Sequence, residues 1–429
     1  MLKLSHCVGG TVCGLTAGVL GSLMLGVSAA WAGGAWVYET GATDVGTASA
    51  GRAALANDAS TAFGNPAGMT RLASQAQFGL QPLIVTTEFD TGAGTTIAGT
   101  NGGNAGGFVP SGGVYGIYGP WEDLRLGFAF NSYAGGSLNY DSDWVGRYIV
   151  TEGTLLTFNL NPVIAYRVLP WLSLGAGFSV QWAKLKSELA VNNIAEGLAD
   201  GRMQYDDTNF GFGGNVGALF EIDTQTRIGV TYRSQVDQGF DDVPSFAQLG
   251  PGLETILQAA GVLDASLGLD LTIPQEVMVS VYRDVTDDLA VMANFNWQDW
   301  SQFGDIGVSL STVPPRSQAV DADFDDTFQA AVGAHYRLAA PTLLQLGFAY
   351  DTSAVSTANR SPTLPVDRQI RFGVGVQYDV NADYVIGFAY EYADLGSADI
   401  DVTRPSGTVQ GDYEANSLNV FNLTVLHRF

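Results

Sequence analysis

Large apolar side chains alternate with small or polar ones along much of the chain, with a period of two residues. From Leu172 to Trp182 the even positions are mostly large and apolar, whereas the odd positions carry Ser, Gly and Gln. Successive side chains of a β-strand point to opposite faces, so this pattern predicts a strand with one lipid-facing and one polar face. The same split recurs at 154–168 and at 383–394.

Fourteen segments of this kind are predicted as strands, and the connections between them alternate between short turns and long loops. Such alternation is typical of outer-membrane barrels, and an even strand number agrees with their parity. A further strand at 302–311 would make the count odd and is disfavoured. A soluble sandwich would carry more charge on its outer faces. The predicted strands are 75–87, 113–119, 124–132, 154–168, 171–186, 209–222, 226–236, 269–283, 289–300, 325–338, 342–351, 368–380, 383–394 and 417–429.

The first 32 residues have the order of features that a secretory signal peptide requires. Lys3 precedes an apolar run over 8–29, and Ala30-Trp31-Ala32 forms a small-residue cleavage site. The alternative, a membrane anchor, fits poorly because the run is rich in Gly and Ser. Both cysteines, Cys7 and Cys13, lie inside this segment. The mature chain therefore has no disulfide and no Cys-ligated metal site.

Composition narrows the class of protein further. Only 14% of residues are charged, against about 25% in soluble globular proteins. The net charge of −24 argues against a nucleic-acid partner, because a phosphate backbone requires a basic surface. We therefore expect an all-β fold: a transmembrane antiparallel β-barrel over 74–429 in the outer membrane. The terminal Phe429, preceded by alternating apolar residues, is typical of the signal that the barrel-assembly machinery recognises.

Residues 33–73 do not alternate and are rich in Gly and Ala. They contain too little charge for a disordered tail. We expect this segment to fold inside the lumen as a plug, or hatch, with Asn65, Pro66 and Ala67 as its gating residues.

The mature chain resembles the FadL-type long-chain fatty acid transporter family of outer-membrane proteins. The resemblance implies a fourteen-stranded barrel, plugged by the hatch, that takes up hydrophobic molecules. Extracellular loops would catch the cargo, an internal pocket would hold it, and it would leave sideways through the wall when the hatch moves. The motifs that carry the resemblance are Gly51-Arg52-Ala53, Asn65-Pro66-Ala67, Trp144-Val145-Gly146-Arg147-Tyr148, Asn159-Leu160-Asn161-Pro162, Tyr232-Arg233-Ser234, Leu271-Thr272-Ile273-Pro274-Gln275, Trp300-Ser301-Gln302-Phe303 and Leu364-Pro365-Val366-Asp367-Arg368.

Two of the long loops, 187–208 and 237–268, are the candidates for capturing the cargo. An exposed apolar patch in an extracellular loop marks a binding surface. The alternative is that the two loops simply pack together, and both interpretations can hold if a groove remains between them. The capture residues predicted in the longer loop are Leu249, Leu253, Ile256, Leu257, Val262 and Leu263.

Charged residues are also predicted on the inner face of the wall. Their ordinary role is to pair with one another and with the hatch, but an inward arginine can also hold a ligand carboxylate. Arg233 is the candidate for this second role. Lys184 and Lys186 fall on the lipid-facing side, where they are expected to meet lipopolysaccharide phosphates.

The expected function is transport and not catalysis. The histidines of the mature chain, His335 and His427, have no nucleophile or metal-ligand spacing around them, so no cofactor and no metal is expected. We expect a monomeric uptake channel for hydrophobic molecules, with long-chain fatty acids as the expected cargo. The alternatives are the same barrel with neutral alkanes or aromatic hydrocarbons as cargo, a surface receptor or adhesin, and a general aqueous porin, against which the hatch argues.

Overall fold

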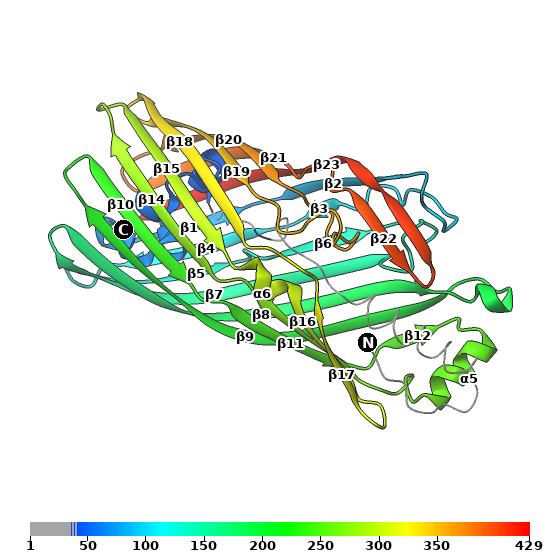
Figure 1. Ribbon diagram of the computed structural model, residues 1–429. Helices are drawn as coiled ribbons and strands as arrows, with labels where there is room; N and C mark the ends of the chain where they lie inside the picture. Colours follow the sequence, from blue (N-terminus) through cyan, green and yellow to red (C-terminus); the bar gives the residue numbers. More distant parts are fainter. Residues whose placement is uncertain (1–35, 37, 39–40) are drawn as a thin grey trace.

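The computed structural model describes residues 36, 38 and 41–429, so the predicted signal peptide lies outside the described residues. The fold is a closed antiparallel barrel of fourteen strands, as predicted (Figure 1). The barrel closes where β1 (Gln75–Leu80) pairs with β23 (Gly407–Arg428), with Gln75 opposite Arg428. Among the described residues, none of the helices is long and apolar enough to cross a membrane.

Three of the barrel strands are interrupted. β1 continues after a break as β2 (Leu83–Thr91), β3 (Gly107–Val109) precedes β4 (Gly112–Tyr118), and β5 (Leu124–Asn131) is followed by β6 (Gly135–Asn139). The remaining barrel strands are continuous: β7 (Glu152–Leu169), β8 (Leu172–Val191), β9 (Gly201–Glu221), β10 (Thr226–Arg233), β14 (Glu276–Asp284), β15 (Leu289–Gln298), β18 (Thr327–Ala339), β19 (Thr342–Asp351), β20 (Gln369–Asp379), β21 (Tyr384–Asp394) and β23.

The alternation predicted from the sequence appears as two different faces of the wall. On β8, Phe178 is 53% exposed on the outer face, whereas Ser179 and Gln181 on the inner face are 2% and 0% exposed. Apolar side chains suit the outer face, because lipid chains cannot form hydrogen bonds with polar groups. The inner face is therefore left for polar residues, the hatch and the passage.

The hatch fills much of the lumen with short helices. These are α2 (Ala42–Gly46), α3 (Arg52–Leu55), α4 (Thr61–Gly64) and the 3-10 helix η1 (Pro66–Arg71), and nearly all their residues are buried. Glycines on the inner face of the wall make room for them. A Cβ at Gly217 would overlap the side-chain oxygen of Asn65, and one at Gly175 would lie 2.5 Å from the amide nitrogen of Ala67.

The extracellular loops form a layer of their own that covers part of the barrel mouth. A separate four-stranded sheet contains β11 (Val236–Asp242), β13 (Leu267–Ile273), β16 (Asp305–Leu310) and β17 (Arg316–Asp321). The helix α6 (Trp300–Gly304) precedes β16, and the connection from β11 to β13 contains β12 (Ser245–Ala247), which pairs with β9, and the helix α5 (Pro251–Ala259). Other loops contain η2 (Ile194–Glu196) and β22 (Ile400–Arg404).

The structure differs from three of the predicted strand boundaries. The segment 269–283 is not one strand: its first part belongs to β13 in the loop sheet, and the barrel strand begins after Pro274, which cannot donate a ladder hydrogen bond. A strand does exist near 302–311, as β16, but it lies outside the barrel. Most of 187–208 is strand, because β8 and β9 extend well into the expected long loop.

Candidate functional site

The barrel wall contains a seam between β3 and β6 where backbone pairing is missing. The pairing of β4 with β5 ends at Gly113 and Asn131. Beyond that point β3 pairs with β2 and β6 pairs with β7, and no ladder joins β3 to β6 in the described part of the chain. On the extracellular side, backbone hydrogen bonds between the two flanking loops close the seam: the amide of Asn139 donates to the carbonyl of Ala105 at 2.8 Å, that of Asp141 to Gly102 at 3.0 Å and that of Val145 to Thr100 at 3.0 Å.

The seam arises because the wall strand bends between β5 and β6. Gly135 has a φ of +144°, a conformation that glycine adopts readily, and a Cβ there would lie 2.5 Å from the carbonyl oxygen of Leu155. Sequence reasoning placed 133–153 in a loop and missed this feature. The pair Gly135-Gly136 was the one available sign of an irregular strand.

An apolar cavity lies behind the seam. No charged side chain lines it, and its polar groups are all engaged. Thr87 donates to Asn416, Ser137 lies 2.9 Å from the hydroxyl of Thr154, and Thr363 donates to Ser361. The lining residues are Leu83, Val85, Thr87, Val109, Gly135, Gly136, Ser137, Leu138, Thr363, Leu364, Pro365, Val366, Leu395, Asn416 and Leu418.

The start of the described chain lies against the bend of this wall strand. Trp36 forms an antiparallel bridge with Ala134, and its ring packs edge-on against Tyr133 with centroids 5.0 Å apart. Tyr133 in turn contacts Phe63 of the hatch, with ring centroids 5.3 Å apart. The hatch and the seam are thus joined through one cluster of aromatic rings, which sequence reasoning did not identify.

The predicted gating residues anchor the hatch to the wall. Asn65 caps η1: its side-chain oxygen accepts the amide of Ala67 at 3.1 Å, and Pro66 occupies the first helical position, where no amide is needed. The Asn65 amide group donates to the carbonyls of Ala53 at 2.7 Å and of Ala218 at 3.1 Å. Asn65 therefore links two hatch helices to β9.

Arg233 points inward, as predicted, and lies in contact with the hatch. Its side chain is buried beside Glu276, with Nε 3.5 Å from the carboxylate. Its Nη2 donates to the carbonyl of Phe63 at 2.8 Å, and its guanidinium lies 3.8 Å from the centroid of the Phe63 ring. The structure thus shows the ordinary pairing role for Arg233, and its role toward a ligand carboxylate stays a prediction.

A second buried ion cluster lies on β19, β20 and β21. Arg371 is flanked by Asp351 at 3.3 Å and Glu391 at 3.6 Å, and Tyr38 of the hatch segment packs over its guanidinium.

Within the hatch, burial raises the pKa of Asp58 above its ordinary value, although hydrogen bonds from Ser60 and Thr43 oppose this shift.

The six predicted capture residues come together in and around α5. Leu257 and Val262 are buried in the loop core, and Leu253 and Ile256 are half-buried. Leu249 and Leu263 line a shallow groove with Pro244, Phe246 and other loop residues.

The two capture loops also pack together. Glu196 accepts the amides of Gly252 and Leu253 at the start of α5, and Asn193 donates to the carbonyl of Gln248 at 2.8 Å. The predicted packing between the two loops is therefore present. The groove at Leu249 and Leu263 lies within the loop 237–268 and not between the two loops, so the capture role of these residues stays a prediction.

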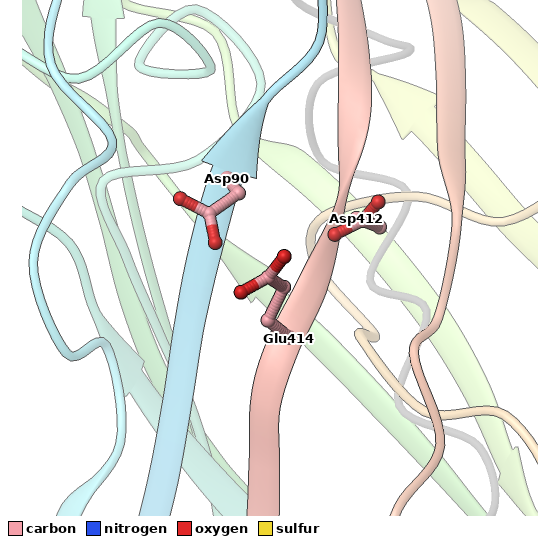
Figure 2. Close-up of side chains that lie close together, drawn as sticks. All are labelled: Asp90, Asp412 and Glu414. Carbon is pink, nitrogen blue, oxygen red and sulfur yellow. The ribbon is translucent and has the colours of Figure 1, made fainter.

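Charged groups on the outside of the wall are largely balanced or acidic. Lys184 and Lys186 pair with Asp206 and Glu152, at 3.0 and 2.6 Å. Figure 2 shows three carboxylates gathered on β2 and β23: Asp90, Asp412 and Glu414. Their spacing would suit a cation, but exposed acidic groups are common without one, so the cluster does not define a metal site.

The closed barrel, the internal hatch and the apolar cavity behind a wall seam define a plugged transmembrane channel for hydrophobic molecules. The family described as outer membrane protein transport protein (OMPP1/FadL/TodX) matches residues 23–429, and the chain belongs to this family. The protein is therefore an outer-membrane protein, and the members of its family are transport channels and not enzymes.

Relatives of known name agree with this assignment. The long-chain fatty acid transport protein of Escherichia coli O6:H1 is 28% identical over 90% of this chain and 92% of its own length. Outer membrane protein P1 of Haemophilus influenzae is 26% identical over 86% of this chain and 88% of its own length.

Solved structures share the fold. A Pseudomonas aeruginosa FadL homologue has a TM-score of 0.83 at 20% identity, covering 92% of this chain and 99% of that chain. The toluene transporter TbuX of Ralstonia pickettii has a TM-score of 0.66 at 19% identity, covering 92% of this chain and 99% of that chain.

Proposed function

We propose that this protein takes up long-chain hydrophobic molecules, fatty acids foremost, by capture in the loops, storage in the internal cavity and lateral exit through the seam. The observation that carries the proposal is the apolar cavity directly behind unpaired strands. A passage through a wall of paired strands would require breaking a ladder of hydrogen bonds, whereas no ladder joins β3 to β6 among the described residues.

The hatch would act as the gate. The Trp36 bridge to Ala134 and the rings of Tyr133 and Phe63 connect the hatch to the bend of the seam. Withdrawal of Trp36 would remove this bridge and free Ala134 to move. No energy source in the chain is needed, because a hydrophobic cargo moves down its gradient into the lipid.

The loops would raise the local concentration of cargo before entry. The groove at Leu249 and Leu263 lies in the extracellular loop 237–268, and its lining combines apolar side chains with Ser245, Gln248 and Glu254. Relatives named as long-chain fatty acid transport proteins support an aliphatic cargo, while the fold shared with toluene transporters keeps neutral hydrocarbons as the second candidate. We also propose contact with lipopolysaccharide, assembly by the barrel-assembly machinery and a monomeric state.

Uptake by intact cells that lack their own channel tests the route. Gly136 lines the cavity, so Gly136→Trp should fill it and lower the rate of long-chain cargo uptake at least tenfold. Ser317→Trp adds the same bulk to the exposed hairpin strand β17 and should leave uptake unchanged.

Each outcome is informative if both variants reach the outer membrane in equal amounts. Normal uptake by the Gly136 variant would contradict lateral exit through the seam. Failure of the unaltered protein to increase uptake of any fatty acid or hydrocarbon would contradict the transport function itself.

A further inference from the structure

We infer that the cargo occupies the internal cavity with an uncharged head group, as a protonated acid, an alcohol, an ester or a hydrocarbon, and not as a carboxylate anion. This inference rests on the proposed function and narrows its substrate class. It follows from the distribution of charge inside the barrel, where the cationic groups are already occupied.

Three arginines that are buried in the lumen beside the hatch have carboxylate partners, whereas a fourth, Arg227, donates to the backbone carbonyls of Ala54 and Leu55 and stacks on Tyr282. Arg371 lies between Asp351 and Glu391, and its Nη2 donates to Gln369 at 2.7 Å. Arg233 pairs with Glu276. A third arginine, on the hatch itself, has the same arrangement: Arg52 lies 3.8 Å from Asp44.

Carboxylates outnumber guanidinium groups in these clusters, because Arg371 has two acidic partners. The Nε and Nη1 atoms of Arg233 have no hydrogen-bond partner, but a ligand carboxylate that approached them would add a further buried anion beside Glu276. A buried anion without a counter-charge of its own is strongly unfavourable. These three clusters therefore repel an anion more than they attract one.

The cavity behind the seam provides no alternative partner. Its lining contains no Lys, Arg or His, and its most polar side chain, Asn416, already donates to the carbonyls of Pro365 at 2.6 Å and Gly396 at 3.1 Å. An ionised head group placed there would lose its water without gaining a charged partner. Desolvation of this kind raises the pKa of a bound carboxyl group and favours its protonated form.

The other cations of the described chain lie elsewhere or are paired. The polar cavity on the periplasmic side of the hatch contains three arginines but five aspartates, so it too is acidic. In the loops, Arg147 and Arg360 pair with Asp200 and Asp367. Arg316 and Arg404 lie on extracellular hairpins, and neither lines the cavity behind the seam.

Competition binding with three ligands of equal chain length tests the inference. The mature protein in lipid nanodiscs is loaded with a neutral fluorescent naphthylamine probe, with empty nanodiscs as the blank for partitioning into lipid. Hexadecanol, hexadecanoic acid and the permanent anion hexadecanesulfonate then compete at pH 5 and pH 8. We expect hexadecanol to bind equally at both pH values, the acid to bind at least tenfold more weakly at pH 8, and the sulfonate to bind weakly at both.

A cation placed in the cavity should reverse this preference. Leu364→Lys puts an ammonium group on the loop that lines the cavity and should tighten binding of the acid relative to the alcohol at pH 8. Arg233→Met should leave the ratio of acid to alcohol affinity unchanged. Equal or tighter binding of the anions than of hexadecanol at pH 8, or a selective loss of acid binding in the Arg233 variant, would overturn the inference. Failure of all three ligands to compete would instead count against the proposed transport function.

Discussion

Removal of the Asn65 side chain should loosen the hatch without unfolding the barrel. Asn65 makes three hydrogen bonds, two buried ones within the hatch and a partly buried one to the carbonyl of Ala218 on β9. At about 1 kcal/mol net for each bond, Asn65→Ala should destabilise the docked hatch by about 3 kcal/mol. Because about 1.4 kcal/mol corresponds to a factor of ten, the undocked population should rise roughly 100-fold.

Single-channel recording in planar lipid bilayers measures this population as the fraction of time in conducting states. Asn57→Ala is the matched control, because Asn57 lies in the same hatch but bonds only to Thr43, at 3.3 Å, among the hydrogen bonds described. Both variants should keep the heat-modifiable gel mobility of a folded barrel. An open fraction for Asn65→Ala equal to that of the control would refute the view that Asn65 holds the hatch to the wall.

Three further predictions concern buried charge and the capture loop. Arg371→Met should lower the free energy of unfolding by about 3–5 kcal/mol, because Asp351 and Glu391 stay buried without a cation; denaturant titration followed by gel mobility measures the loss. Because burial raises the pKa of Asp58 in the docked hatch above its ordinary value of 3.8, docking favours the protonated acid, so the hatch is held most firmly below that pH and less firmly as the pH rises through the raised pKa; protease protection of the hatch should be greater below pH 3.8 than at pH 7, and Asp58→Asn should remove the difference. Leu257→Asp places a charge in the loop core, so the cargo concentration for half-maximal uptake should rise while the maximal rate is kept.

The wall of the barrel could be predicted because its determinants are local. Alternation along each strand, such as Phe178 outside and Ser179 inside, follows from the contrast between lipid and lumen and needs no knowledge of the neighbouring strands. The inward direction of Arg233 followed from the same parity. Its partners, Glu276 and Phe63, lie far away in the sequence, so parity could not identify them.

The seam and the loop layer could not be predicted for a related reason. The Gly135-Gly136 pair marks β6 as irregular, but the seam itself depends on which strands β3 and β6 pair with, and this is set by residues far apart in the sequence. Large and small side chains alternate in the strands of the loop sheet as they do in the barrel strands. The pattern therefore predicts one strand over 269–283, although Pro274 divides it in two. Which strands pair with each other depends on the whole fold and cannot be inferred from the sequence of one segment.

The position of the hatch ahead of β1 has a consequence for the order of assembly. The barrel closes only when β23, its final strand, pairs with β1, whereas the hatch precedes every strand of the wall. Export in chain order therefore delivers the hatch before there is a lumen to contain it. The inner glycines at 175 and 217, on neighbouring strands of the middle of the wall, fit closely around Asn65 and Ala67. The wall is thus built around its plug, and a hatch that folds slowly would be expected to delay closure of the barrel.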